Sequence, residues 1–218
     1  MQIFYQQPLG RELARLESEQ LQRTLGKLFA PRALQLGNSK LIAPHQFKHF
    51  VVMDPLHTNY TQLPFRDDSF ELVLLPHILE FEMDSTAVIE EAWRVLAPNG
   101  HLVILGFNPW SLWGIRHLCA SRWSGIPWHG HFYSAEKLQW RLRQMEAEIV
   151  TYKSFFHRPP IAHATFLTQT RWLEPIVRLL LPSCGGVYLI MAKKCIIPLT
   201  PIVPRWRWQT LLAYEKNC

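Results

Sequence analysis

A strand, a helix, a turn and a second strand follow one another directly in the middle of the sequence. SFELVLLPH (69–77) is almost continuously apolar, which is typical of a parallel strand covered on both faces. STAVIEEAWRVL (85–96) spaces its apolar residues along one side of a helix, with Ser85 as the candidate N-cap. A Pro-Asn-Gly turn at 98–100 ends that helix before the strand HLVILGF (101–107). Because such crossovers join parallel strands, the chain is predicted to be an α/β protein.

Further elements flank this unit on both sides. Leucines recur at three- to five-residue steps from Leu9 to Leu28, which predicts an amphipathic helix ended by Pro31. The last two predicted strands are expected to form an antiparallel pair. In order, the other predicted elements are strands at RALQLG (32–37) and FKHFVVMD (47–54), a helix at 134–145, a strand at 148–156, a less regular helix at 171–181 and a strand at 185–194.

The length of 218 residues suits one domain with a sizeable core. We divide the chain into an N-terminal helical extension (1–31), an α/β domain (32–195) and a C-terminal tail (196–218). The tail holds the basic, aromatic cluster RWRWQ (205–209), whose tryptophans either cover apolar surface or stack on bases or lipid.

Composition narrows the class of protein. No apolar stretch is long enough for a membrane span, and the N-terminus lacks the pattern of a signal peptide, so we expect a cytoplasmic protein. The four cysteines have neither disulfide-framework nor metal-ligand spacing, so no metal is expected. The net charge of +6 permits contact with a polyanion such as nucleic acid, but much of this charge lies near the C-terminus.

Two segments, LPFRDDSFELVLLPHILEF (63–81) and EEAWRVLAPNGHLVILGF (90–107), together resemble the class I S-adenosylmethionine-dependent methyltransferases. The likeness is to the ubiquinone-pathway C-methyltransferases and the malonyl-carrier-protein O-methyltransferases. In these enzymes a Leu-Pro-Phe loop precedes a strand opening with Ser-Phe-Asp, and a helix ends in Arg-Val-Leu-x-Pro-Gly-Gly. The matching residues are Leu63, Pro64, Phe65, Ser69, Phe70, Arg94, Val95, Leu96, Pro98 and Gly100, while Glu71 and Asn99 are replacements.

The resemblance implies a Rossmann-like, mostly parallel sheet with an antiparallel last strand and helices on both faces. It also implies S-adenosyl-L-methionine as cofactor, bound across the carboxyl ends of the early strands. Gly37 would let the backbone approach the cofactor, and Asn38 would supply a left-handed turn. Asp54 is the candidate acceptor for the ribose hydroxyls, with turn capping or an adenine-side role as alternatives. The implied cofactor-binding residues are Gly37, Asn38, Asp54, Leu63, Leu75, Pro76 and His77.

Two features depart from the family pattern. The usual Gly-x-Gly loop is replaced by Gly37-Asn38-Ser39-Lys40, with a single glycine. Asp54 and Leu63 are also too close in sequence for the helix and third strand that normally separate them. Either this unit has been lost, or Asp54 follows the third strand and the second strand is displaced.

The candidate catalytic residues are His77 and Glu80, at the exit of the strand where the family transfers its methyl group. The imidazole of His77 has a pKa suited to a base, although a structural or cofactor-lining histidine is an alternative. Glu80 has helix capping as its alternative role. We interpret GFNPWSLWG (106–114) as a loop lining the acceptor pocket, or else as aromatics covering the core. The candidate pocket residues are Asn108, Trp110, Trp113 and Tyr133.

Three functions remain open from the sequence. The first is methylation of a small-molecule or carrier-bound acceptor. The second is a catalytically inactive, methyltransferase-like module for binding or regulation, suggested by the reduced glycine loop. The third is methylation or binding of nucleic acid, suggested by the positive charge and the aromatic tail.

Overall fold

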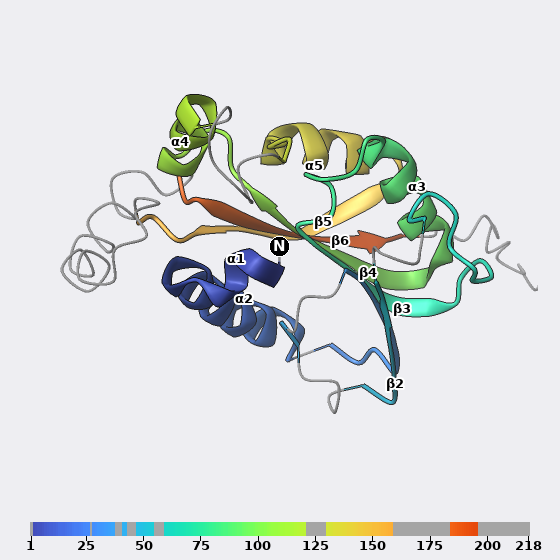
Figure 1. Cartoon of the computed structure of the whole chain (residues 1–218). Helices are drawn as coiled ribbons and strands as arrows, with labels where there is room; N and C mark the ends of the chain where they lie inside the picture. Colours follow the sequence, from blue (N-terminus) through green and yellow to red (C-terminus); the bar gives the residue numbers. More distant parts are fainter. Residues whose placement is uncertain are drawn as a thin grey trace, which may run out of the picture.

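The computed structural model shows a six-stranded sheet with helices on both faces (Figure 1). The strands lie in the order β2-β1-β3-β4-β6-β5. Their bounds are Arg32–Leu36 (β1), His49–Met53 (β2), Phe70–Pro76 (β3), Leu96–Phe107 (β4), Ala147–Phe155 (β5) and Val187–Lys194 (β6). The structure describes residues 2–26, 28–37, 41–42, 47–54, 59–120, 130–158 and 184–195.

Strand directions confirm the predicted fold class. β1 pairs in parallel with β2 and with β3, and β3 pairs in parallel with β4. β6 runs antiparallel to both of its neighbours, β4 and β5. β6, the last strand among the described residues, is therefore the one reversed strand of this sheet, and it forms the expected antiparallel pair with β5.

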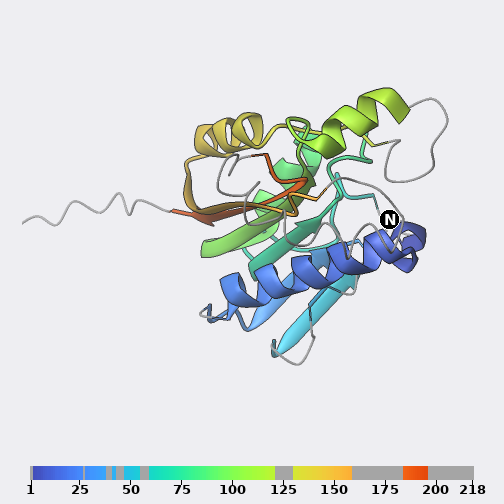
Figure 2. The same cartoon turned by 90° about the vertical axis from the view of Figure 1, so that its left-hand side faces the viewer.

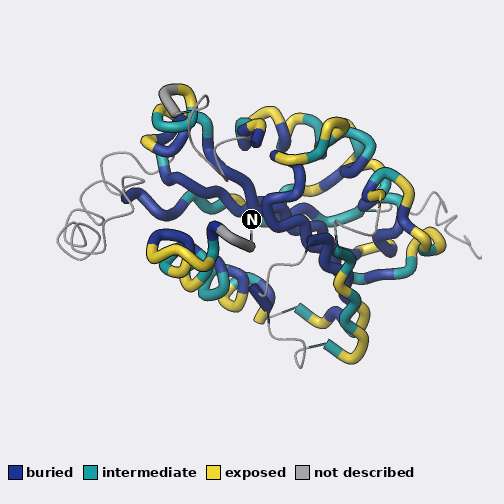
Figure 3. The backbone as a smooth tube through the Cα atoms, in the orientation of Figure 1, coloured by how far each residue is buried: buried dark blue, intermediate teal, exposed yellow. Residues whose placement is uncertain are grey.

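The helices form two layers around the sheet. Helix α1 (Gln2–Gln6) and helix α2 (Pro8–Leu25) cover one face, while α3 (Ser85–Val95) and α5 (Ala135–Gln144) cover the other (Figures 1 and 2). Helix α4 (Leu112–Ala120) follows β4 and lies at the carboxyl edge of the parallel strands. The central strands are buried along most of their length (Figure 3).

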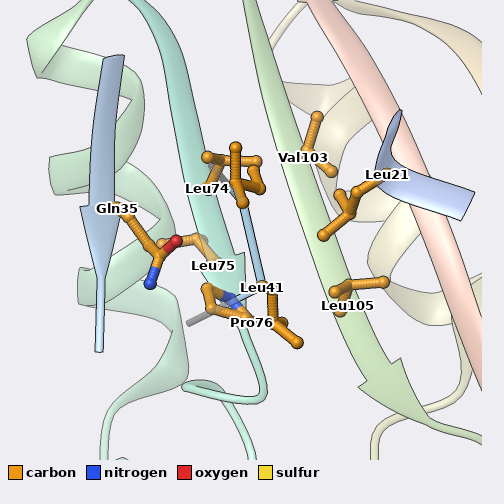
Figure 4. Close-up of a pocket in the computed structure, with 9 residues that line it drawn as sticks. Leu21, Gln35, Leu41, Leu74, Leu75, Pro76, Val103 and Leu105 are labelled. Atoms are coloured by element: carbon orange, nitrogen blue, oxygen red, sulfur yellow. The ribbon is translucent and has the colours of Figure 1, made fainter. Parts of the chain in front are cut away.

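Helix α2 packs directly on the sheet. Leu13 and Leu21 are buried in one apolar cluster with Leu74 of β3 and Leu105 of β4. The remaining gap beside Leu21 is a cavity of about 10 Å³, lined mostly by apolar side chains (Figure 4). This space is too small and too apolar to hold a bound molecule larger than water. The N-terminal helix thus shares the core of the α/β domain.

Helix α3 begins and ends slightly differently from the prediction. Asp84, not Ser85, is its N-cap, because the Asp84 side chain accepts a hydrogen bond from the amide of Ala87 at 3.0 Å. Asp84 therefore does what was expected of Ser85: its side chain accepts from an amide in the first turn of the helix, at position N3. The helix ends at Val95 and β4 begins at Leu96, so Asn99, with φ of 61°, is a turn inside a strand and not a linker before it.

One further prediction is corrected, one of two alternatives is favoured, and two predictions fall outside the described residues. The segment from Leu112 is helix α4, not a loop, because Trp113 and Gly114 pack inward while its other face points to solvent. Asp54 follows the strand next to β1, and within the described part of the chain β2 has no outer neighbour. This arrangement favours the first alternative, in which the helix and third strand that normally separate the ribose-binding acid from the Leu-Pro-Phe loop have been lost from the described sheet. The predicted helix at 171–181 and the tail at 196–218 lie outside the described residues.

Candidate active site

The carboxyl ends of the parallel strands bring four predicted site residues to one edge of the sheet. Gly37 follows β1, Asp54 follows β2, His77 follows β3 and Asn108 follows β4. Because parallel strands end on the same side, these residues lie at the edge of the sheet where open α/β proteins bind their ligands.

Gly37 joins the ends of β1 and β2. Its amide donates a hydrogen bond to the carbonyl of Met53 at 2.8 Å, and the amide group of Gln35 donates to the Gly37 carbonyl at 3.0 Å. Gly37 has a φ of +84°, a conformation that disfavours any residue with a Cβ. A Cβ there would also lie 2.6 Å from Cδ1 of Ile78. Both the backbone conformation and the close packing of Ile78 therefore require glycine at this strand end.

Asp54 is half-buried directly after β2. Tyr60 holds this strand end, since its hydroxyl donates to the carbonyl of Met53 at 3.1 Å. Burial raises the pKa of Tyr60, so it remains a donor at neutral pH. Asn38 lies outside the described residues, and its role stays a prediction.

His77 is fully buried between two carboxylates. Its Nε2 lies 2.8 Å from Oε1 of Glu17 on α2, and its Nδ1 lies 3.0 Å from Oε1 of Glu80. The His77 backbone adopts a φ of +53°, which is rare for a residue with a side chain. Such conformations persist only where surrounding contacts hold them, and they gather at functional sites.

The two carboxylates decide the charge of His77. Burial alone would lower its pKa, but attraction and hydrogen bonds from Glu17 and Glu80 outweigh burial and raise the pKa to about 10. The imidazole is therefore protonated at neutral pH and donates to both carboxylates. In this arrangement it holds a proton and is not ready to accept one, so a role for His77 as base stays a prediction.

The buried network extends beyond the imidazolium. Tyr5 of α1 donates its hydroxyl to Oε2 of Glu17 at 2.8 Å, and burial followed by the charge of Glu17 raises the pKa of Tyr5. The amide of Phe107 donates to Oε1 of Glu80 at 2.9 Å. Oε2 of Glu80 is buried and has no hydrogen-bond partner among the described residues. This oxygen can therefore accept a further hydrogen bond near the end of β3.

The remaining predicted residues have mainly packing contacts. Leu75 and Pro76 are buried in β3, and buried Leu63 is held by the bond from its amide to Glu91 at 2.7 Å. Asn108 bonds the carbonyl of Gly185 at 3.1 Å and accepts from the amide of Trp110.

The four candidate pocket residues do not converge on one cavity. Trp113 is buried, stacks on Phe107 with centroids 5.6 Å apart, and donates to the Arg158 carbonyl at 3.0 Å. Trp110 points into solvent, and Tyr133 lines a separate groove between α3 and α5. Their role in binding an acceptor stays a prediction.

Sequence reasoning missed Tyr5 and Glu17. The signal was present in the N-terminal helix, where Glu17 stands midway between Leu13 and Leu21 at four-residue steps. Those positions share one helix face, so a carboxylate within the leucine stripe had to be buried and needed partners.

Comparisons with known proteins identify the family. A family described as methyltransferase domain matches residues 10–104. This chain belongs to the class I S-adenosylmethionine-dependent methyltransferases. It is 34% identical over 151 residues to the uncharacterized protein YafS of Escherichia coli, an alignment covering 69% of this chain and 57% of YafS. It is also 35% identical over 85 residues to the demethylmenaquinone methyltransferase of Deinococcus radiodurans, covering 39% of this chain and 33% of that enzyme.

Solved structures agree with the fold of this family member. One is an S-adenosylmethionine-dependent methyltransferase from Thermotoga maritima, described as a possible histamine N-methyltransferase. It superposes with a TM-score of 0.59 at 18% identity, and the match covers 89% of this chain and 100% of that chain. The N-methyltransferase NodS from Bradyrhizobium japonicum, solved with S-adenosyl-L-homocysteine, has a TM-score of 0.51 at 16% identity, covering 86% and 88% of the two chains. This methyltransferase family member spans little more than half the length of YafS.

The described residues fit the cofactor of this family, S-adenosylmethionine, at two points. A glycine whose conformation excludes a Cβ ends β1, and a carboxylate ends the neighbouring β2. These are the groups needed for backbone approach and for hydrogen bonds to paired hydroxyls.

Proposed function

We propose that this protein transfers the methyl group of S-adenosylmethionine to a small-molecule or carrier-bound acceptor at the carboxyl edge of β1 to β4. The observation that carries the proposal is the junction of Gly37 and Asp54. The bond between the Gly37 amide and the Met53 carbonyl, 2.8 Å long, fixes the two strand ends side by side. A ligand that lies across these two adjacent strand ends would contact both residues.

Each residue of the junction has a distinct task in this proposal. The bare backbone of Gly37 admits the cofactor, and Asp54 accepts hydrogen bonds from its ribose hydroxyls. The cofactor supplies an electrophilic methyl group on a sulfonium. The protein then has to align the acceptor with that group and exclude water.

Glu80 is the residue we assign to the acceptor. Its Oε1 is used by His77 and Phe107, whereas its buried Oε2 has no partner among the described residues. A buried carboxylate oxygen without a donor is costly, and an N–H or O–H group of the acceptor would satisfy it. In this proposal His77 keeps its proton and holds Glu80 in position.

A second candidate function is a binding module that takes up the cofactor without transferring its methyl group. One observation favours it: Glu17, which is itself bonded to Tyr5, already occupies Nε2 of His77. In this alternative the network at the end of β3 stabilises the fold and meets no acceptor.

Calorimetry with S-adenosylmethionine and S-adenosylhomocysteine tests the proposal. We expect micromolar binding to the wild type and none to Gly37→Arg, whose side chain fills the strand end. Ile78→Ala is the matched variant, because it removes the side chain that faces Gly37 and should preserve or strengthen binding. Circular dichroism checks that both variants fold.

The two functions differ in turnover. Release of S-adenosylhomocysteine on addition of a fractionated small-molecule extract or of carrier-bound acyl groups supports the enzyme. Binding without release under any of these conditions supports the module. Absence of binding to either ligand by the wild type contradicts both.

A further inference from the structure

Helix α4 presents an apolar face to solvent at the carboxyl edge of the sheet. Leu112, Ile115 and Leu118 are 49%, 59% and 78% exposed, and Trp110 just before the helix is 73% exposed. The three helical residues are spaced three apart and therefore share one side of the helix. We call Trp110, Leu112, Ile115 and Leu118 the α4 apolar face.

The inner side of α4 is firmly anchored, so the apolar face is held in place. Trp113 is buried against Phe107, Phe4 and Phe156. Gly114 sits so close to Pro109 that a Cβ would lie 1.8 Å from the Pro109 carbonyl oxygen. Helix α4 projects from one end of the molecule, beside the ends of the strands (Figures 1 and 2).

The sequence around α4 is free of negative charge. No aspartate or glutamate occurs from residue 96 to residue 135, whereas Arg116 and Arg122 lie in that stretch. Exposed aliphatic and indole groups beside arginines, in a stretch of sequence without acidic residues, are complementary to anionic lipid headgroups above an acyl layer.

We propose that the α4 apolar face docks on an anionic lipid bilayer. Ile115 and Leu118 enter the boundary between headgroups and acyl chains, and the indole of Trp110 lies at the headgroup level that tryptophan favours. Arg116, on the same helix, faces the anionic headgroups. Docking in this orientation turns the carboxyl edge of the sheet toward the bilayer.

A bilayer suits this face better than a second copy of the chain. Stable protein interfaces bury roughly 800 Å² on each partner, more than four side chains on a nine-residue helix supply. A short amphipathic helix with projecting side chains can instead insert into a soft, flat surface without a matching groove.

Vesicle flotation with the full chain tests the proposal. We expect the wild type to float with vesicles of equal parts phosphatidylglycerol and phosphatidylcholine, and much less with phosphatidylcholine alone. The double variant Ile115→Asp/Leu118→Asp should lose at least about tenfold in vesicle affinity, because two carboxylates oppose both apolar insertion and the anionic surface. Trp140→Asp is the matched control, since Trp140 is 63% exposed on α5 and lies outside this face.

Three results would overturn the proposal. One is a wild type that stays unbound to anionic vesicles at low salt. Another is equal flotation of the wild type and the double variant, with both shown to be folded by circular dichroism. The third is a dimer by sedimentation velocity that the double variant abolishes, which would assign this face to a second copy.

Discussion

Oε1 of Glu17 lies 2.8 Å from Nε2 of His77, so a carboxylate of the N-terminal helix reaches the end of β3 across 60 positions of sequence. This contact makes α2 part of the candidate active site as well as a cover for the sheet. It also means that anything binding at the end of β3 meets a charged network, because His77 carries its proton between two carboxylates.

Replacing Glu17 with leucine should destabilise the protein although it completes the leucine stripe of α2. The variant leaves the buried Tyr5 hydroxyl and His77 Nε2 without their acceptor. We expect a loss of about 3 kcal/mol in the free energy of unfolding, measured by urea titration. Glu19→Leu, at a solvent-facing partner of Arg15, should change stability by less than about 0.5 kcal/mol. A Glu17→Leu protein as stable as the wild type would contradict the buried network.

The stability conferred by His77 should depend on pH above neutrality. The pKa is raised from near 6.5 in the unfolded chain to about 10 in the folded protein, so its contribution is complete below pH 6.5 and disappears as the pH passes 10. The difference in stability between the wild type and His77→Gln should therefore shrink from pH 6 to pH 10, by more than about 1.4 kcal/mol. Parallel urea titrations across this range measure it, and a constant difference would argue against an imidazolium.

Lys194 should stabilise the C-terminal end of α3. Its ammonium donates to the carbonyls of Trp93 and Leu96 at 3.0 and 2.6 Å and to Asp68 at 2.8 Å. Lys194→Met removes these donors near a helix end and should cost about 1–3 kcal/mol. The neighbouring Lys193→Met is the control, with an expected change below about 0.5 kcal/mol. Thermal unfolding of the two variants side by side decides the matter, and equal melting temperatures would count against this role.

Gly37→Ala should cost stability for two separable reasons. The left-handed backbone accounts for about 1–2 kcal/mol, and contact with Ile78 adds to it. In an Ile78→Ala background the same substitution should cost only the backbone part. A double-mutant cycle in urea measures the coupling, which should be zero if the two side chains do not meet.

Much of the fold was predictable because its signals are local. The near-continuous apolar run of β3, the helical spacing in α3 and the turn at Asn99 lie within one stretch of chain, and each limits the backbone directly. Helix α4 was missed because its exposed apolar residues hide the usual contrast between polar and apolar faces. The short spacing between Asp54 and Leu63 predicted either a lost helix–strand unit or a displaced second strand. Sequence spacing alone could not choose between them, whereas the described sheet has no strand outside β2.

The site was less predictable because its central contacts are long-range. Gly37, Asp54, His77 and Glu80 were identified from their places after predicted strands, and the structure does bring these strand ends to one edge. The charge of His77 depends on Glu17, and nothing local to His77 indicates that partner. A buried histidine without charged partners would have a lowered pKa and would be neutral. The carboxylates around His77 reverse this and keep the imidazole protonated.

The most direct test of the central claim is the affinity for S-adenosylhomocysteine of Asp54→Asn compared with Asp67→Asn. Both substitutions replace a carboxylate by an amide of the same size, but Asp67 is an exposed partner of Arg94 away from the strand ends. We predict that calorimetry finds a loss of about tenfold or more for Asp54→Asn and wild-type affinity for Asp67→Asn, since a charge-assisted hydrogen bond is worth about 1.5–3 kcal/mol. Equal affinities of the two variants would contradict a cofactor site at the junction of β1 and β2.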